Sequence, residues 1–250
     1  QLFGGGGDTG DESYQQPAYA TEAAGPTEPF AILPLESPTP WSDLTIRPTS
    51  DSSAASASTK GQTWLVMLYQ DADDKILEQD IYLDLNEAER IGSSDRLTIV
   101  AQVDRFRAGF QGDGDWTSAK RFLVTQDDDL GRVRSQQIAD LGEANMADAA
   151  ELVDFVEWAV KNYPADRTAL ILSDHGMGWP GGWSDADSAG RSNSSAPLAA
   201  NLGDQIYLND LDAALGEIRS RTGLGQCDLI GLDACLMGQL EVFSALSPHA

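Results

Sequence analysis

Two short apolar segments each lead directly into a side chain that can do covalent chemistry. Residues 170–174 (LILSD) precede His175, and residues 228–234 (DLIGLDA) precede Cys235. Apolar runs of this length are typical of strands buried in a parallel sheet. Ligands bind at the carboxyl ends of such strands, and an imidazole beside a thiol is the pair that activates a nucleophilic cysteine. The two segments therefore predict nucleophilic chemistry of the kind that cysteine proteases use.

Each of the two residues also has an ordinary structural interpretation. We expect a helix at residues 236–246, whose N-terminus would lower the pKa of the Cys235 thiol, but cysteine is also common as a small buried core residue. His175 is one of two histidines, and an isolated histidine is often a structural or surface residue. Gly176 follows His175, and glycine lets a backbone N–H approach a substrate closely, which makes this N–H a candidate oxyanion donor.

The remaining pattern predicts an α/β fold that would bring both residues to one edge of a sheet. Apolar runs predict strands, stretches with helical periodicity predict helices, and two β-prone runs around three aspartates predict a hairpin. The expected strands are residues 64–69, 97–103, 168–173 and 228–232, the helices are 75–91, 148–163, 207–222 and 236–246, and the hairpin joins 121–125 to 133–138. This order implies a three-layer sandwich with a mostly parallel central sheet.

Composition divides the chain into two parts. Residues 1–60 contain a run of four glycines and most of the prolines, so we expect a disordered, low-complexity linker or pro-region that cannot bury a core. Residues 61–250 are long enough for one domain with a sizeable core. A low-complexity segment ahead of a domain fits an exported protein, and we predict an extracellular or cell-surface location.

The balance of charge excludes some partners. The chain carries 40 acidic and 16 basic residues, for a formal net charge of −24, whereas nucleic acids need a basic footprint. The charge would steer cationic substrates toward the protein, although a solvated acidic surface explains it as well. No apolar run reaches the roughly 18 residues of a transmembrane helix. We therefore expect neither a nucleic-acid partner nor a transmembrane segment.

The two cysteines flank one predicted strand. Cys227 and Cys235 are eight residues apart, and at about 3.3 Å per residue their Cα atoms lie well beyond the roughly 7 Å limit for a disulfide. Cys235 is therefore expected to be a free thiol, and Cys227 a structural residue. Two cysteines and one suitable histidine do not complete a structural zinc shell, so we expect no metal ligands of that kind.

The two motifs together, residues 173–179 (SDHGMGW) and 232–238 (LDACLMG), resemble the clostripain family of cysteine endopeptidases, peptidase family C11. The resemblance extends to residues 64–69 (WLVMLY) and 141–146 (LGEANM), and covers about residues 62–250. It implies a caspase-like fold and a Cys-His dyad, with Cys235 as the nucleophile and His175 as the catalytic histidine. Gly176 and Cys235 would supply the N–H groups of the oxyanion hole.

The resemblance also implies a substrate and an activation step. Asp233, two residues before the nucleophile, corresponds to the acid of an S1 pocket for Arg or Lys, because a buried carboxylate forms a charge-assisted pair with a guanidinium. Alternatively, Asp233 caps the following helix. Family members are activated by cleavage between the histidine and the cysteine, where Arg191 is the candidate processing site or an ordinary loop arginine. A monomer, processed into two chains, is expected.

The family's domain continues beyond the helix that follows the nucleophile, so we expect this chain, which stops at Ala250, to be truncated at its C-terminus. The alternative function is therefore a non-catalytic binding module or an inactive fragment on the same fold. The chemistry needs no cofactor. Some family members depend on calcium, and Asp71, Asp73, Asp74 and residues 127–129 are candidate ligands, but no EF-hand spacing is present and a solvated acidic loop is favoured.

Overall fold

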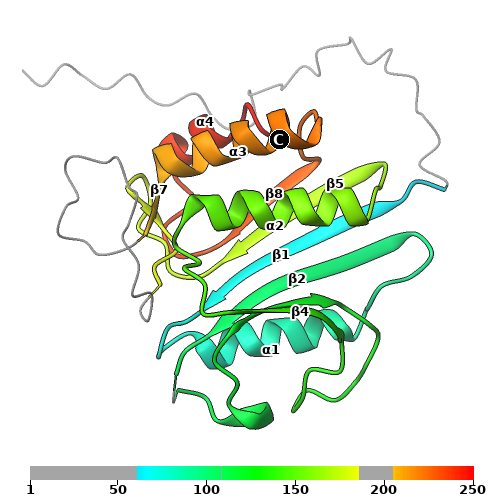
Figure 1. The fold of residues 1–250 in the computed structure, drawn as a ribbon. Helices are drawn as coiled ribbons and strands as arrows, with labels where there is room; N and C mark the ends of the chain where they lie inside the picture. The colour runs from blue at the N-terminus through cyan, green and yellow to red at the C-terminus, as the bar shows by residue number, and fades with distance from the viewer. Residues whose placement is uncertain (1–60, 108, 186–204) are drawn as a thin grey trace, which may run out of the picture. The chain divides into compact units, whose positions relative to one another are not determined.

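A six-stranded sheet lies at the centre of the computed structural model, which describes residues 61–107, 109–185 and 205–250 (Figure 1). The strand order is β4-β3-β2-β1-β5-β8. Four of the strands are parallel: β1 (Trp64–Ala72), β2 (Leu97–Arg105), β5 (Arg167–Ser173) and β8 (Leu229–Asp233). The antiparallel hairpin of β3 (Ala119–Leu123) and β4 (Gln136–Gly142) extends the sheet beside β2. The expected mostly parallel sheet is confirmed.

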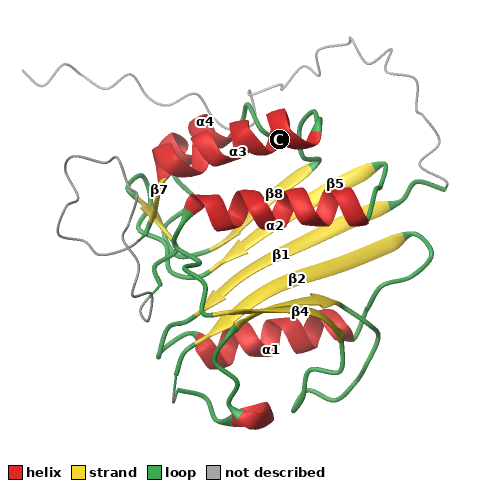
Figure 2. Ribbon diagram, viewed as in Figure 1, coloured by secondary structure: helices red, strands yellow, loops and turns green. Residues whose placement is uncertain are grey.

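Helices cover both faces of this sheet. Helix α1 (Glu78–Glu89) lies on one face, and α2 (Ala149–Asn162), α3 (Leu208–Thr222) and α4 (Leu240–Leu246) lie on the other (Figure 2). A short helical turn, η2 (Gly112–Gly114), and a small pair of strands, β6 (Gly181–Gly182) with β7 (Ile206–Tyr207), complete the described elements. The three-layer sandwich expected from the order of elements is therefore confirmed.

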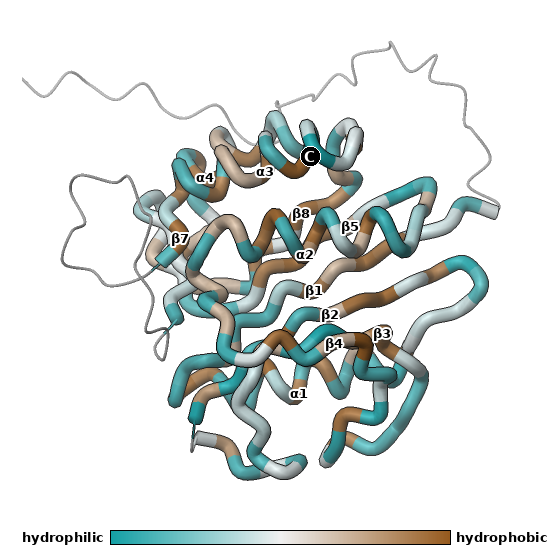
Figure 3. Tube along the Cα trace, viewed as in Figure 1, coloured by the Kyte–Doolittle hydropathy of each residue, from teal (hydrophilic) through white to brown (hydrophobic). Residues whose placement is uncertain are grey.

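The position of β1 at the centre of the sheet explains why its side chains are apolar on both faces. Leu65, Met67 and Tyr69 are almost fully buried and pack in the core formed with α2 and α3. Val66 and Leu68 point the other way and pack against the core formed with α1. Figure 3 shows the hydrophobic residues gathered along the strands, whereas the helices alternate between hydrophobic and hydrophilic stretches. Because amphipathic helices cover both faces of the sheet, the strand between them is most stable when consecutive residues are apolar.

Two expectations fall on residues that lie outside the described ranges. The predicted linker at residues 1–60 is one, and the candidate processing site Arg191, within residues 186–204, is the other. In the described part of the chain, no helix is both long enough and apolar enough to cross a membrane.

Candidate active site

The segments that carry His175 and Cys235 leave the sheet side by side. Strands β5 and β8 are parallel neighbours, and Ser173 pairs with Asp233 at their carboxyl ends. The N–H of Asp174 donates a hydrogen bond of 3.2 Å to the carbonyl of Asp233, which continues this contact into the two loops. The sheet therefore delivers the histidine and the cysteine to the same edge, as the sequence predicts.

Gly176 allows the two loops to approach closely. A Cβ atom placed on Gly176 would lie 2.2 Å from the carbonyl oxygen of Cys235, so any larger residue would push the loops apart. Gly178 contacts the second loop too, because its own added Cβ would lie 2.3 Å from the side-chain nitrogen of Gln239. The carboxamide oxygen of Gln239 accepts a hydrogen bond of 3.1 Å from the N–H of Trp179. These contacts join the histidine loop to the cysteine loop.

The N–H of Gly176 is a free donor within the described part of the chain. Its neighbours on the loop are bonded, since Met177 donates to the carbonyl of Gly181 and Trp183 donates to the carbonyl of His175. Gly176 bridges to Gly182 between these two bonds, and its own N–H takes no part in them. A buried N–H that is not used by the fold suits an oxyanion hole.

His175 has a carboxylate partner that the sequence analysis did not assign to it. Its Nε2 lies 3.3 Å from Oδ1 of Asp74, and the imidazole is 39% exposed. Oδ1 of Asp74 also accepts hydrogen bonds from the N–H groups of Ile76 (2.7 Å) and Leu77 (2.8 Å), which fix the carboxylate just before α1. Asp74 comes directly after β1, the neighbour of β5, and this position at the carboxyl edge is the signal that could have identified it.

Cys235 is an exposed free thiol. The prediction that a helix begins directly after this residue is wrong. Helix α4 begins at Leu240, and residues 234–239 form a turn in which Leu236 has a left-handed φ of 62°. The side chain of Met237, which belongs to this turn, is buried in the core. The thiol therefore does not lie at a helix N-terminus. Of the two apolar residues that suggested an earlier start of the helix, Met237 anchors the turn in the core, whereas Leu236 is exposed.

The second cysteine is structural, as expected. Cys227 is buried in the core beside α3, and burial raises the pKa of its thiol. No disulfide joins it to Cys235, since both are free.

Asp233 is exposed at the end of β8 in the described part of the chain, whereas the sequence analysis expected a buried carboxylate. Its charge reaches α1, where Asp84 has a pKa raised to about 6, first by desolvation and then by repulsion from Asp233. Asp84 and Asp233 are therefore close enough for their negative charges to repel each other. The alternative role for Asp233 as a helix cap is wrong, because Gln239 is the N-cap residue of α4.

The candidate calcium ligands separate into three places. Asp73 lies with Glu143 and Asp185, one carboxylate oxygen from each being within 4.8 Å of the others. Asp71 is fully buried nearby, and Asp74 instead contacts His175. Residues 127–129 are elsewhere, and Asp129 forms an ion pair with Arg134.

Two further acids, Asp104 and Asp174, are buried at the carboxyl edge of the sheet. Burial is the main reason that the pKa of each is raised to about 8.

This mostly parallel α/β sandwich, with histidine and cysteine loops after two neighbouring strands, is the architecture of the caspase-like cysteine peptidases. Residues 68–250 match the model of the clostripain family, and the chain belongs to this family. Clostripain from Hathewaya histolytica is 27% identical over 215 residues, which cover 80% of this chain and 39% of clostripain.

Solved structures share the fold at lower identity. A secreted C11 cysteine protease from Bacteroides thetaiotaomicron, in complex with an irreversible peptide inhibitor, is 20% identical with a TM-score of 0.50 over 75% of this chain and 47% of that one. An inactive zymogen of a C11 protease from Parabacteroides distasonis is 20% identical with a TM-score of 0.52 over 76% of this chain and 47% of that one. This chain thus spans less than half the length of these relatives.

Proposed function

We propose that this chain carries the catalytic residues of a cysteine endopeptidase, with Cys235 as the nucleophile and His175 as the acid and base. The observation that supports this proposal most directly is the contact between Gly176 and the backbone of Cys235, which joins the two loops at the sheet edge. The exposed, unbridged thiol and the family membership of the chain support it further.

In the proposed reaction the sulfur of Cys235 attacks the scissile carbonyl carbon, and the carbonyl oxygen becomes an oxyanion. The N–H groups of Gly176 and Cys235 donate hydrogen bonds to this oxyanion. His175 transfers the thiol proton to the leaving amine as the C–N bond breaks, which leaves a thioester. His175 then takes a proton from water as the water attacks the thioester, and the cysteine thiol is restored as the acid product leaves.

Asp74 acts as the positioning residue for His175 in this proposal. Its carboxylate is held by two backbone N–H groups and lies 3.3 Å from Nε2, so it favours the tautomer that carries a proton on Nε2. Nδ1 is then the ring nitrogen left for exchange of a proton with the thiol. In this arrangement the base, His175, is oriented by a third group, the carboxylate of Asp74, as in other sites with an activated nucleophile.

The proposed substrates are peptides with Arg or Lys at P1. Asp233, aided by the nearby charge of Asp84, supplies negative potential beside the nucleophile. A guanidinium bound to such a carboxylate forms a charge-assisted pair. We further propose extracellular action, in line with the secreted relative, and self-cleavage after Arg191 by a monomer, giving two chains.

A non-catalytic binding module is the second candidate. It is favoured by the turn after Cys235, because the thiol lacks the helix N-terminus that would activate it.

The test is hydrolysis of a fluorogenic peptide with Arg at P1, in reductant, by the longest natural form of the chain and by residues 1–250. Cys235→Ala should abolish cleavage, while Cys227→Ala, a matched change at the buried cysteine, should retain most of it. Equal activity in both variants would identify a different nucleophile. No cleavage by any form would support the binding module.

The substrate preference has its own test. Asp233→Asn should reduce kcat/KM for an Arg peptide while leaving that for a peptide with a neutral P1 residue nearly unchanged. An equal loss on both peptides would overturn the S1 role.

A further inference from the structure

Residues 181–185, the return segment, turn back after the histidine loop and pair with it. Gly182 bridges to Gly176 in the antiparallel sense. The N–H of Trp183 donates a hydrogen bond of 2.9 Å to the carbonyl of His175. A Cβ atom on Gly182 would lie 2.4 Å from the same carbonyl oxygen, so the two segments are in close contact. The return segment therefore holds the backbone of His175 directly.

Trp183 has a backbone conformation that is rare for a large side chain. Its φ is 56°, in the left-handed region that is strained for residues other than glycine. In the described part of the chain, Trp183 and Leu236 are the only apolar side chains with such a φ. Leu236 directly follows Cys235, so both strained residues adjoin the proposed catalytic loops. Strain of this kind persists where the surrounding structure enforces it, and active sites are common places for it.

The left-handed conformation lets two consecutive N–H groups donate to the same loop. In an extended strand the N–H groups of neighbouring residues point to opposite edges. Here the N–H of Trp183 donates to the carbonyl of His175, and the N–H of Ser184 donates to Oδ2 of Asp174 at 2.6 Å. The change of backbone direction at Trp183 brings both donors to the histidine loop. The dipeptide that leads out of β5 is thus held by its main chain and by its side chain.

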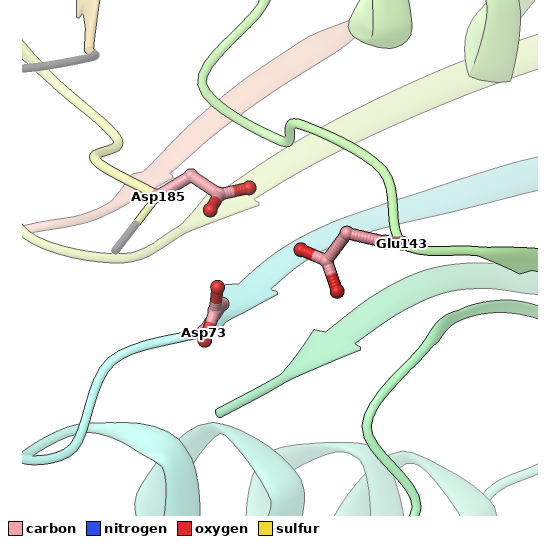
Figure 4. Close-up of side chains that lie close together, drawn as sticks. All are labelled: Asp73, Glu143 and Asp185. Atoms are coloured by element: carbon pink, nitrogen blue, oxygen red, sulfur yellow. The ribbon is translucent and has the colours of Figure 1, made fainter. Parts of the chain in front are cut away.

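The indole of Trp183 anchors this conformation. The residue is 0% exposed and belongs to the core that β5 forms with α2 and α3. Its carbonyl accepts a hydrogen bond of 3.1 Å from the N–H of Ile206 in β7. Two residues further on, Asp185 accepts a hydrogen bond of 2.8 Å from the N–H of Met146, and its side chain is directed toward two further acids (Figure 4). The return segment is therefore fixed by contacts other than those with the histidine loop.

The indole acts through its bulk. Its Nε1 has no hydrogen-bond partner in the described part of the chain, so a polar contact does not explain a tryptophan at this position. A large side chain in a close-packed core resists any rotation of the backbone that would move it. An aromatic side chain without an N–H should therefore serve as well.

We propose that Trp183 is a positioning residue for His175. The buried indole holds the backbone of Trp183 in the left-handed region, the two N–H groups hold residues 174 and 175, and the imidazole is thereby kept beside Asp74. The consequence for catalysis rests on the proposed function, in which His175 is the acid and base. The position of the imidazole is measurable without catalysis.

The first test is NMR spectroscopy of the chain carrying Cys235→Ala and isotope-labelled histidine. The chain has two histidines, so the imidazole of His249 is an internal reference for that of His175. Trp183→Phe should leave the His175 signal unchanged, whereas Trp183→Ala should shift or broaden it. Phe122→Ala removes a buried aromatic residue from the core on the α1 side and is the matched control, which should leave the signal unchanged. An unchanged signal in folded Trp183→Ala would overturn the proposal.

Trp183→Gly separates backbone conformation from packing. Glycine adopts a φ of 56° without strain, although it leaves a larger gap in the core than alanine does. Trp183→Gly should therefore displace the His175 signal less than Trp183→Ala. A displacement at least as large would show that the indole only fills the core, which would also overturn the proposal.

Gly182→Ala tests the same contact without a change in the core. Its Cβ would push the return segment away from the carbonyl of His175, so the His175 signal should move while Trp183 stays in place. This variant decides the question if Trp183→Ala or Trp183→Gly does not fold, because an unchanged signal would mean that the return segment does not position the histidine.

Steady-state kinetics of the active form of the chain give the second readout. Trp183→Ala should lower kcat for an Arg peptide by about 10- to 100-fold and change KM by less than about threefold, as expected when a catalytic group is misplaced. Trp183→Phe should retain kcat to within about threefold. Absence of cleavage by every form would overturn the proposed function, and the NMR comparison would still decide the role of Trp183.

Discussion

At the scale of single residues, the two cysteines differ in environment although they flank one strand. Cys235 is exposed in the turn before α4, whereas Cys227 is buried in the core and burial raises the pKa of its thiol. A raised thiol pKa lowers the fraction of reactive thiolate at any given pH. In the folded protein at pH 8, iodoacetamide should therefore label Cys235 and leave Cys227 unmodified.

Peptide mass spectrometry after a timed reaction measures this difference, and labelling in 6 M guanidinium serves as the control in which both thiols react. Rapid labelling of Cys227 in the folded protein would contradict the burial of that residue.

Asp74 is the second residue for which a local contact sets the expected behaviour. Asp74→Ala removes the oxygen that faces His175 Nε2 and should lower kcat by up to about 100-fold with little change in KM, since misplacing a catalytic group by about 1 Å costs this much. Asp74→Asn keeps an acceptor oxygen and should cost about tenfold or less.

Steady-state kinetics with an Arg peptide separate the two parameters. A change in KM with kcat unaltered would mean that Asp74 contacts the substrate and does not position the histidine. Asp128→Ala provides a control for the loss of an acidic charge.

At the scale of elements, α1 is joined to β2 by a buried ion pair. Nε of Arg105 lies 2.9 Å from Glu78, and both side chains are almost fully buried. The guanidinium packs over the rings of Tyr82, Phe110 and Trp116, at 5.0, 5.5 and 4.9 Å from their centroids. Arg105→Met leaves Glu78 as an uncompensated buried charge and should lower the free energy of unfolding by about 3–5 kcal/mol.

Urea denaturation measures this loss. The double variant Arg105→Met with Glu78→Leu removes both charges and should recover much of the stability. Arg134→Met breaks an exposed pair with Asp129 and should change the free energy of unfolding by less than about 1 kcal/mol. A loss in the double variant as large as in Arg105→Met would show that packing of the guanidinium matters more than the buried charge.

The elements also show what the sequence could and could not predict. Strands such as β1 were predictable because a strand covered by helices on both faces carries a run of consecutive apolar residues, here residues 64–69. The start of α4 was not predictable, because Leu236 has a left-handed backbone conformation and Met237, in the turn before the helix, is buried in the core. The partner of His175 is marked only by its position just after a predicted strand. The grouping of Asp73 with Glu143 and Asp185 depends on segments that are distant in the sequence, and no local pattern marks it.

At the scale of the whole molecule, the net charge of −24 acts together with the position of exposed acids. Asp233 is exposed at the end of β8 and Glu143 is exposed after β4, both at the carboxyl edge of the sheet that also carries His175 and Cys235. The negative potential is therefore expected to concentrate near the proposed nucleophile and to attract cationic peptides over a distance. Salt screens such attraction, since the Debye length falls from about 30 Å at 0.01 M to about 3 Å at 1 M.

This field predicts a dependence on ionic strength that grows with the charge of the substrate. For a peptide with Arg at P1 and further lysines outside the site, kcat/KM should fall by at least about tenfold between 0.01 and 0.5 M NaCl. A peptide with the same P1 residue but net charge zero should lose much less, because its single pairing with Asp233 is short-range. The matched comparison holds the S1 contact constant and varies only the long-range attraction. Equal salt dependence for the two peptides would mean that the acidic surface serves solubility and does not guide substrates to the active site.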